Sequence, residues 1–171
     1  MASAHEPLGY SRAQIALHWT IALLVILQLF IGEDIVPAYR AFRRGTEPSA
    51  DAVFDANIHV YVGIAILVLA LVRLLLRMGR GVPAYPVGGS KGERYLAIAV
   101  HGLLYLAILG MPITGGLAWY FGIGLAGEVH ELAKPIIIAA VVLHTAGALW
   151  QHFYARSDVL VRMLKPQRHQ V

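Results

Sequence analysis

The chain has 171 residues, of which 58% are hydrophobic and 14% are charged, and its net charge at pH 7 is +4. This composition, with a mean hydropathy of +0.63, is unusual for a soluble domain and points to a membrane protein. The absence of cysteine excludes disulfides, cysteine-ligated iron–sulfur clusters and haem attached covalently through cysteine, and the modest charge gives no reason to expect a nucleic-acid partner.

Four runs without a charged residue predict four membrane spans, because each run, the second with its flanks, can cross a hydrocarbon core of about 30 Å. In chain order the runs are residues 13–32, 56–72, 95–127 and 135–155. Together with their flanks they predict helices over residues 11–32, 52–78, 91–118 and 128–155. We therefore predict an all-α fold, an integral membrane four-helix bundle that residues 1–171 form as a single domain.

Local signals indicate where the predicted helices begin and end. The capping-box pattern occurs at the first and third helices, in the pairs Ser11–Gln14 and Ser90–Glu93. Gly79 and Gly81 predict the end of the second helix. The third run is too long for one span, and its glycine-rich tail predicts a loop that begins at Trp119 and runs to the fourth helix.

The distribution of lysine and arginine predicts the orientation. If both termini lie inside, the inner segments contain ten basic residues: Arg12, Arg73, Arg77, Arg80, Lys91, Arg94, Arg156, Arg162, Lys165 and Arg168. The outer loops then contain only four: Arg40, Arg43, Arg44 and Lys134. Because positive residues concentrate on the cytoplasmic side, this bias favours an N-in/C-in topology.

Four histidines occupy matched depths in the predicted bundle. His130 and His144 lie 14 residues apart on the fourth helix, which is about four turns and a rise of about 21 Å, so they share one face near opposite membrane surfaces. By depth, His18 on the first helix pairs with His144, and His59 on the second helix pairs with His130. Imidazole is a normal axial ligand of haem iron, and bundles hold cofactors between facing helices. The pattern favours two stacked metal cofactors.

One inner assignment stays open at this stage. Counted from the nearest inner basic residue, His18 is six residues deep, His144 is twelve and His101 is seven. His18 and His144 thus differ in depth by about 9 Å at 1.5 Å per residue, which helix tilt could absorb. His101 is therefore an alternative inner ligand, or a polar contact of the inner haem or of a quinone. Each histidine also has a plain interpretation, a hydrogen bond to a neighbouring helix.

Arg73 lies 14 residues after His59 and so shares its helix face, at the inner end. A guanidinium there could bind the carboxylate side chains of an inner haem in bidentate fashion. An ordinary anchor at the inner interface explains Arg73 equally well.

Several segments resemble the bacterial cytochrome b-561 family, and the resemblance covers nearly the whole chain. The matching segments are residues 10–19 (YSRAQIALHW), 58–60 (IHV), 72–77 (VRLLLR), 130–131 (HE), 143–144 (LH) and 162–164 (RML). The resemblance implies a four-helix protein of the bacterial inner membrane with two non-covalent haems b. It also implies that His18 and His144 ligate the inner haem iron, and that His59 and His130 ligate the outer one.

Members of this family resemble superoxide oxidases, enzymes that pass electrons from superoxide on the periplasmic side to ubiquinone. The candidate residues for steering the superoxide anion are Arg40, Arg43, Arg44 and Lys134, although ordinary loop charge explains them as well. The candidate residues near quinone or the inner haem are His101, Trp150, Gln151 and His152. At Gln151 and His152 the chain departs from relatives that carry a histidine pair, which weakens a quinone role for these two residues.

Two other functions fit the sequence. The chain could be the membrane cytochrome subunit of a larger complex that receives electrons from a partner dehydrogenase or hydrogenase and passes them to quinone. It could also be a non-redox transporter or membrane scaffold whose histidines relay protons or bind a divalent metal ion. Lipid is a partner in every case.

Overall fold

The computed structural model describes residue 7, residues 9–86 and residues 89–166, and it is built from helices. These are α1 (Arg12–Ile31), α2 (Val36–Arg44), α3 (Ala50–Arg80), α4 (Lys91–Phe121), α5 (Gly124–Phe153) and α6 (Val159–Arg162). Four of them, α1, α3, α4 and α5, are long and apolar enough to cross a membrane. The all-α fold and the four predicted spans are confirmed.

The predicted helix boundaries follow from local hydrogen bonds. In α1, the hydroxyl of Ser11 accepts from the Gln14 backbone N–H, while the Gln14 side chain accepts from the Ser11 backbone N–H. The same reciprocal capping box opens α4, through Ser90 and Glu93. Helix α3 ends at Gly81, whose φ of 74° favours glycine. These signals depend only on neighbouring residues, which is why the sequence was sufficient to find them.

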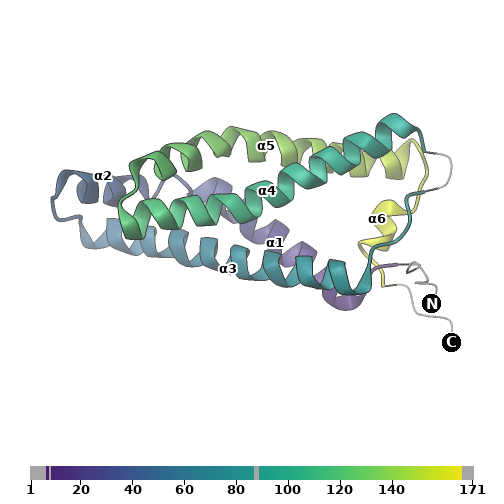
Figure 1. Ribbon diagram of the computed structural model, residues 1–171, viewed down its shortest axis with the longest axis horizontal. Coiled ribbons are helices and arrows are strands. Elements are labelled where there is room, and N and C mark those ends of the chain that lie inside the picture. Colours follow the sequence, from purple (N-terminus) through teal and green to yellow (C-terminus); the bar gives the residue numbers. More distant parts are fainter. Residues whose placement is uncertain (1–6, 8, 87–88, 167–171) are drawn as a thin grey trace.

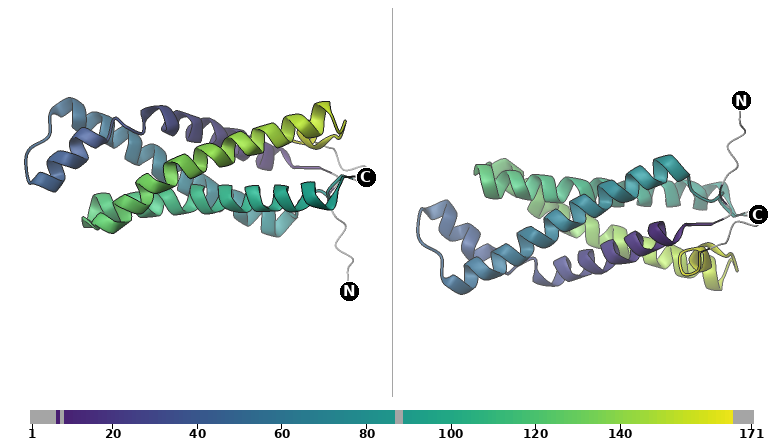
Figure 2. Two further views of the ribbon diagram at one scale, coloured as in Figure 1. Left: turned by 90° about the horizontal axis from the view of Figure 1, so that it is seen from above. Right: turned by 90° about the horizontal axis from the view of Figure 1, so that it is seen from below.

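The spanning helices pack in chain order: α1 against α3, α3 against α4, and α4 against α5. Figures 1 and 2 show an elongated bundle with α2 at one end and α6 at the other. We call these the α2 end and the α6 end. The start of α1 lies at the α6 end, so the chain enters and leaves the bundle on the same side, as four spans require.

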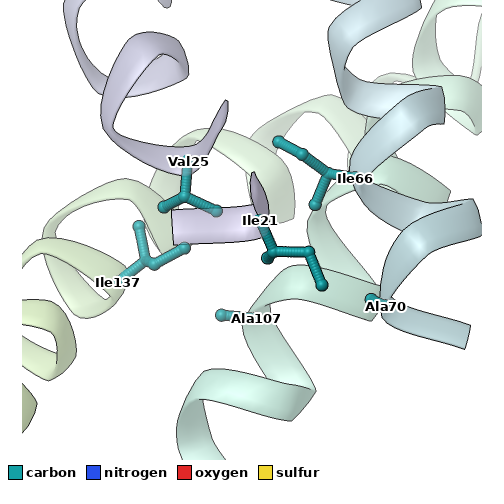
Figure 3. Packing of buried hydrophobic residues seen from close by; sticks show 6 residues of the cluster. All are labelled: Ile21, Val25, Ile66, Ala70, Ala107 and Ile137. Atoms are coloured by element: carbon teal, nitrogen blue, oxygen red, sulfur yellow. The ribbon is translucent and has the colours of Figure 1, made fainter. Parts of the chain in front are cut away.

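The middle of the bundle is a small aliphatic core that draws on all four spanning helices (Figure 3). Its buried members are Ile21, Val25, Ile66, Ala70, Ala107 and Ile137. Large apolar side chains face outward instead, such as Phe30, which is 81% exposed, and Leu106, which is 70% exposed. Outward apolar faces on such long helices are what a lipid environment requires.

Two parts of the predicted organisation were wrong. The outer segment between the first two spans is not simply a loop, because it contains α2, and α6 follows the last span. The predicted glycine-rich loop from Trp119 onward is nearly absent: α4 continues to Phe121 and α5 begins at Gly124. Glycine is frequent in membrane helices because it lets neighbours approach closely, so it did not mark a loop here.

The glycines at this turn form the surface on which α2 packs. A Cβ atom placed on Gly127 would lie 2.8 Å from the Tyr39 hydroxyl oxygen, and one on Gly124 would lie 2.6 Å from a guanidinium nitrogen of Arg43. The ring of Phe42 also lies 6.4 Å from the ring of Trp119. Helix α2 therefore covers the connection between α4 and α5 at the α2 end of the bundle.

Candidate functional site

The structure brings the four histidines together in the two pairs predicted from depth. The ring centroids of His18 and His144 are 6.0 Å apart, and those of His59 and His130 are 6.1 Å apart. The first pair lies toward the α6 end and the second toward the α2 end. Ile137, a member of the central core, is seven residues from both His130 and His144, so an apolar layer separates the pairs.

Each pair joins helices whose backbones stand apart. His18 and His144 bring α1 to α5, and His59 and His130 bring α3 to α5. Within the described residues, neither of these helix combinations is among the closely packed ones. The imidazoles therefore reach toward each other across the interior of the bundle, rather than meeting where two backbones are already in contact.

His130 is held in one orientation by α4. Its Nδ1 lies 2.7 Å from the carbonyl oxygen of Met111, so a proton on Nδ1 leaves Nε2 free as a ligand. A Cβ atom on Gly115 would lie only 3.0 Å from the His130 ring. Gly115 thus provides the space that the ring occupies. The sequence did not reveal this, because a position inside the predicted helix 91–118 does not say which side chain of another helix it faces.

His59 is held differently. The side-chain amide of Gln28 donates from Nε2 to the His59 backbone carbonyl at 2.8 Å. The Nδ1 atom of His59 is buried and has no hydrogen-bond partner in the described part of the chain. Gln28 was not predicted as a site residue. Its position did carry a signal, because it is an amide inside an uncharged membrane run, where polar side chains usually have a partner.

His101 stands beside the α6-end pair. Its Nδ1 lies 2.6 Å from the carbonyl oxygen of Ala97 in its own helix, and its ring centroid is 5.0 Å from that of His144. The rings of His101 and His144 meet edge to face. His101 therefore packs against the His144 ring.

Comparison with known proteins shows the family to which this chain belongs. A family model described as prokaryotic cytochrome b561 matches residues 9–166. Cytochrome b562 of Cereibacter sphaeroides is 39% identical over 162 residues, which cover 95% of this chain and 98% of that protein.

The chain belongs to the prokaryotic cytochrome b561 family. It is similar, at 29% identity and over 93% of its length, to a probable superoxide oxidase CybB of Yersinia pestis, of which 97% is covered. Cytochrome b561 homolog 1 of Escherichia coli is 25% identical over 93% of this chain and 98% of that protein. As a member of this family, the chain is a multi-pass membrane electron-transfer protein, and a cytochrome b of this kind uses haem b. Family membership also decides against the non-redox transporter or scaffold.

The spacing of the two histidine pairs fits a haem iron held between them. A metal–imidazole bond is about 2 Å long and the ring centre lies about 1 Å beyond the nitrogen, so two rings on opposite sides of one metal ion have centroids about 6 Å apart. Both pairs have this spacing, whereas the 5.0 Å between His101 and His144 is too short for it. A Cβ on Gly147, three residues after His144, would meet no atom within 4 Å, so the space beside α5 is open there.

Arg73 lies at the α6 end, as predicted, in a recess between α1, α3 and α4. Its Nη1 donates to the Gln14 backbone carbonyl at 2.8 Å. The recess is lined by Tyr10, Gln14, Arg73, Arg77, Val82 and Tyr105. The Tyr105 hydroxyl is buried and has no partner within the described residues. Two guanidiniums and an unpaired phenol suit an anionic group such as a carboxylate.

The three residues near the end of α5 make contacts that keep the helix terminus in place. Gln151 accepts a hydrogen bond from the Ser157 hydroxyl at 2.9 Å. The indole of Trp150 donates to Glu93 at 3.1 Å and so ties the end of α5 to the start of α4. The His152 ring packs against Phe153, with 4.8 Å between centroids. These contacts give Trp150, Gln151 and His152 structural roles, and none of them requires a quinone.

The four candidate steering residues divide into two groups. Arg40, Arg43 and Arg44 all lie on α2 and are exposed. Lys134 instead forms an ion pair with Glu33, which follows α1 at the α2 end of the bundle. The hydrogen bond and the positive charge of Lys134 hold the pKa of the Glu33 carboxyl below its usual value of 4.5. The positive charge of Lys134 is therefore largely balanced, and the cationic surface at this end is α2.

Proposed function

We propose that this cytochrome b561 family protein holds two haems b, one between His18 and His144 and one between His59 and His130. The observation that carries the proposal is the pair of imidazole spacings, 6.0 and 6.1 Å, at opposite ends of the bundle. A haem held between two imidazoles would have no free position at its iron for oxygen or peroxide. The protein therefore exchanges electrons through the haem edges rather than binding a substrate at iron.

The protein sits in the bacterial inner membrane with both termini inside, so that α2 faces the periplasm. The distribution of ten basic residues inside and four outside supports this topology. His59 and His130 then form the outer pair and His18 and His144 the inner pair. Arg73, beside the inner pair, binds a carboxylate side chain of the inner haem.

The electron donor in this proposal is superoxide, and the acceptor is ubiquinone. The three arginines of α2 support a small anionic donor, because exposed positive charge raises the local concentration of anions. The similarity to a protein named as a probable superoxide oxidase supports the same donor. The enzyme is then a superoxide:ubiquinone oxidoreductase.

The balanced reaction oxidises two superoxide anions for each ubiquinone that is reduced. Each superoxide anion loses one electron and leaves as O₂, and two electrons with two protons convert one ubiquinone to ubiquinol. Bound haem supplies one-electron transfer. The chain's own contribution is to fix the two ring pairs at a constant separation and to keep the layer between them apolar, through Ile137 and its core neighbours.

A second candidate is a cytochrome subunit that takes electrons from a partner dehydrogenase or hydrogenase. It is favoured by one comparison: the relative with 39% identity is named only as a cytochrome b562, whereas the probable superoxide oxidase is 29% identical. The two candidates share the haem sites and differ only in the donor.

Activity of the purified chain alone separates the two candidates. The protein is reconstituted in liposomes with ubiquinone and supplied with superoxide from an enzymatic source. The proposal predicts ubiquinol formation that superoxide dismutase abolishes. Haem that superoxide leaves oxidised, but that a partner dehydrogenase reduces, would assign the chain to the second candidate.

The steering role of α2 is tested in the same liposomes. Replacing Arg40, Arg43 and Arg44 by glutamine should slow haem reduction by superoxide, and raised ionic strength should slow the unsubstituted protein in the same way, because salt screens exposed charges. Arg80→Gln, which removes an exposed charge at the α6 end, is the matched control and should leave the rate unchanged. A rate that responds neither to salt nor to the α2 substitutions contradicts steering but not electron transfer.

A further inference from the structure

We propose that Gln28 is the positioning residue of His59, and that the carboxamide of Gln28 accepts the Nδ1 proton of His59 when Nε2 of His59 binds the iron. The inference rests on the proposed function, because it assigns a role relative to the outer haem. It concerns a residue on α1, a spanning helix that contributes neither His59 nor His130 and that reaches the outer pair through this contact.

Two unpaired atoms lie on two residues that already touch. Gln28 donates from Nε2 to the backbone carbonyl of His59 at 2.8 Å. The other amide atom, Oε1 of Gln28, is buried without a hydrogen-bond partner in the described chain, and so is Nδ1 of His59. One atom is an acceptor and the other carries a proton in the tautomer that leaves Nε2 as ligand. Each therefore supplies the partner that the other lacks.

His130, the other histidine of the outer pair, shows what a hydrogen bond from Nδ1 does. In His130, Nδ1 is satisfied by the carbonyl oxygen of Met111 at 2.7 Å, which fixes both the tautomer and the ring orientation. Metal-bound histidines almost always donate their second ring nitrogen to such an acceptor. Among the residues that the structure describes, His59 has no equivalent carbonyl at its Nδ1, and Gln28 is the acceptor-bearing residue already bonded to it.

Two routes can join Oε1 of Gln28 to Nδ1 of His59. The terminal torsion of glutamine is broad, so the amide can turn toward the ring, or one buried water can join the two atoms, since both are polar and otherwise unpaired. Gly63 lies one turn after His59, and a Cβ there would stand 3.5 Å from Gln28 Nε2. The glycine thus leaves the amide room beside the His59 carbonyl.

The proposal predicts the direction in which the haem potential changes. A hydrogen bond from Nδ1 to an acceptor makes the imidazole more basic and favours the oxidised iron. Gln28→Leu removes the acceptor and should raise the midpoint potential of one haem, by about a tenfold change in its redox equilibrium, which is about 59 mV for one electron. Gln28→Glu keeps an acceptor oxygen whether or not it is ionised, so the potential should stay at the original value or fall below it.

The experiment is a redox titration of the full-length protein and of these variants, with electron paramagnetic resonance of the oxidised haems. The expected result is one raised potential and altered g values in Gln28→Leu, a potential at or below the original value in Gln28→Glu, and an unchanged second haem in both. Thr20→Val, an exposed polar-to-apolar change on α1, is the control and should shift neither haem. If Gln28→Leu does not retain haem, Gln28→Met replaces it, because methionine keeps the unbranched chain without either polar group.

Two results overturn the inference. Either both haem potentials remain unchanged in Gln28→Leu, or Gln28→Leu and Gln28→Glu raise the potential alike, as a general loosening of the site would. If the unsubstituted protein binds two haems and Gln28→Leu leaves both potentials unchanged, this inference alone is refuted. An unsubstituted protein that binds no haem refutes the proposed function and this inference with it.

Discussion

At the scale of single residues, the position of a histidine ring depends on the small size of a neighbouring residue. Gly115 and Gly116 are adjacent in α4, yet only one of them faces a ring. A Cβ on Gly115 would lie 3.0 Å from His130, while a Cβ on Gly116 would meet nothing within 4 Å. The neighbouring glycines therefore form a natural pair of test and control positions.

We expect Gly115→Ala to weaken the outer haem site, because the added methyl group pushes the His130 ring away from the Met111 carbonyl. Changes next to a metal ligand typically cost 10-fold or more in affinity, so we expect haem to be held about tenfold less tightly. Gly116→Ala should bind haem normally. The measurement is the transfer of haem from each variant to apomyoglobin, and equal haem retention in both variants would show that this contact does not position His130.

The pairing of the histidines could be predicted from sequence, because helical rise converts residue number into depth. Gln28 and Tyr105 could not be identified in the same way. Their importance comes from an unpaired atom buried against a neighbouring helix, and depth alone does not say which lateral neighbour a side chain meets. Depth also could not show that His101 packs directly against the His144 ring, instead of lying across a metal ion from it.

At the scale of helices, the spans were predictable and the ends of the molecule were not. The uncharged runs and capping boxes locate α1, α3, α4 and α5. Helix α2 has nine residues and mixes arginines with apolar residues, so it carries no membrane signal. The glycines of the connection between α4 and α5 predicted a loop, but in the structure they form the surface on which α2 packs. Glycine is required at these positions by a contact between segments about 80 residues apart in sequence, which local patterns do not show.

The ion pair of Glu33 and Lys134 ties the C-terminal end of α1 to α5. The pKa of Glu33 is lowered in the folded protein, so the pair stabilises the fold above the ordinary pKa of glutamate and this stabilisation is lost as the pH falls through the lowered value. We expect Glu33→Gln to reduce Tm slightly at pH 7, since the Glu33 side chain is largely in solvent, although that of Lys134 is partly buried.

The difference in Tm between the unsubstituted protein and Glu33→Gln should therefore shrink as the pH falls below 4.5. Thermal unfolding followed by circular dichroism across this range checks it. Glu47→Gln, an exposed carboxylate in the same outer segment for which no ion pair is found among the described residues, is the control. A Tm difference that grows at acidic pH would mean that the pair does not stabilise the fold.

At the scale of the whole molecule, the topology decides which histidine pair faces which compartment. The chain has no cysteine, so single cysteines can be introduced without removing any. We expect Thr46→Cys, between α2 and α3, to react with an impermeant thiol reagent added to intact cells. Ala155→Cys, after α5, should react only when the membrane is opened. Both positions are exposed, and the reverse labelling pattern would invert the direction of electron transfer.

The central claim is that the four paired histidines hold two haems, and haem content per chain tests it most directly. We expect two haems b in the purified protein. We expect one in His18→Ala, His144→Ala, His59→Ala and His130→Ala, since removing one imidazole breaks one site and leaves the other intact. His101→Ala should keep both. A protein that remains colourless when produced with ample haem, or paired-histidine variants that each retain two haems, would contradict the account.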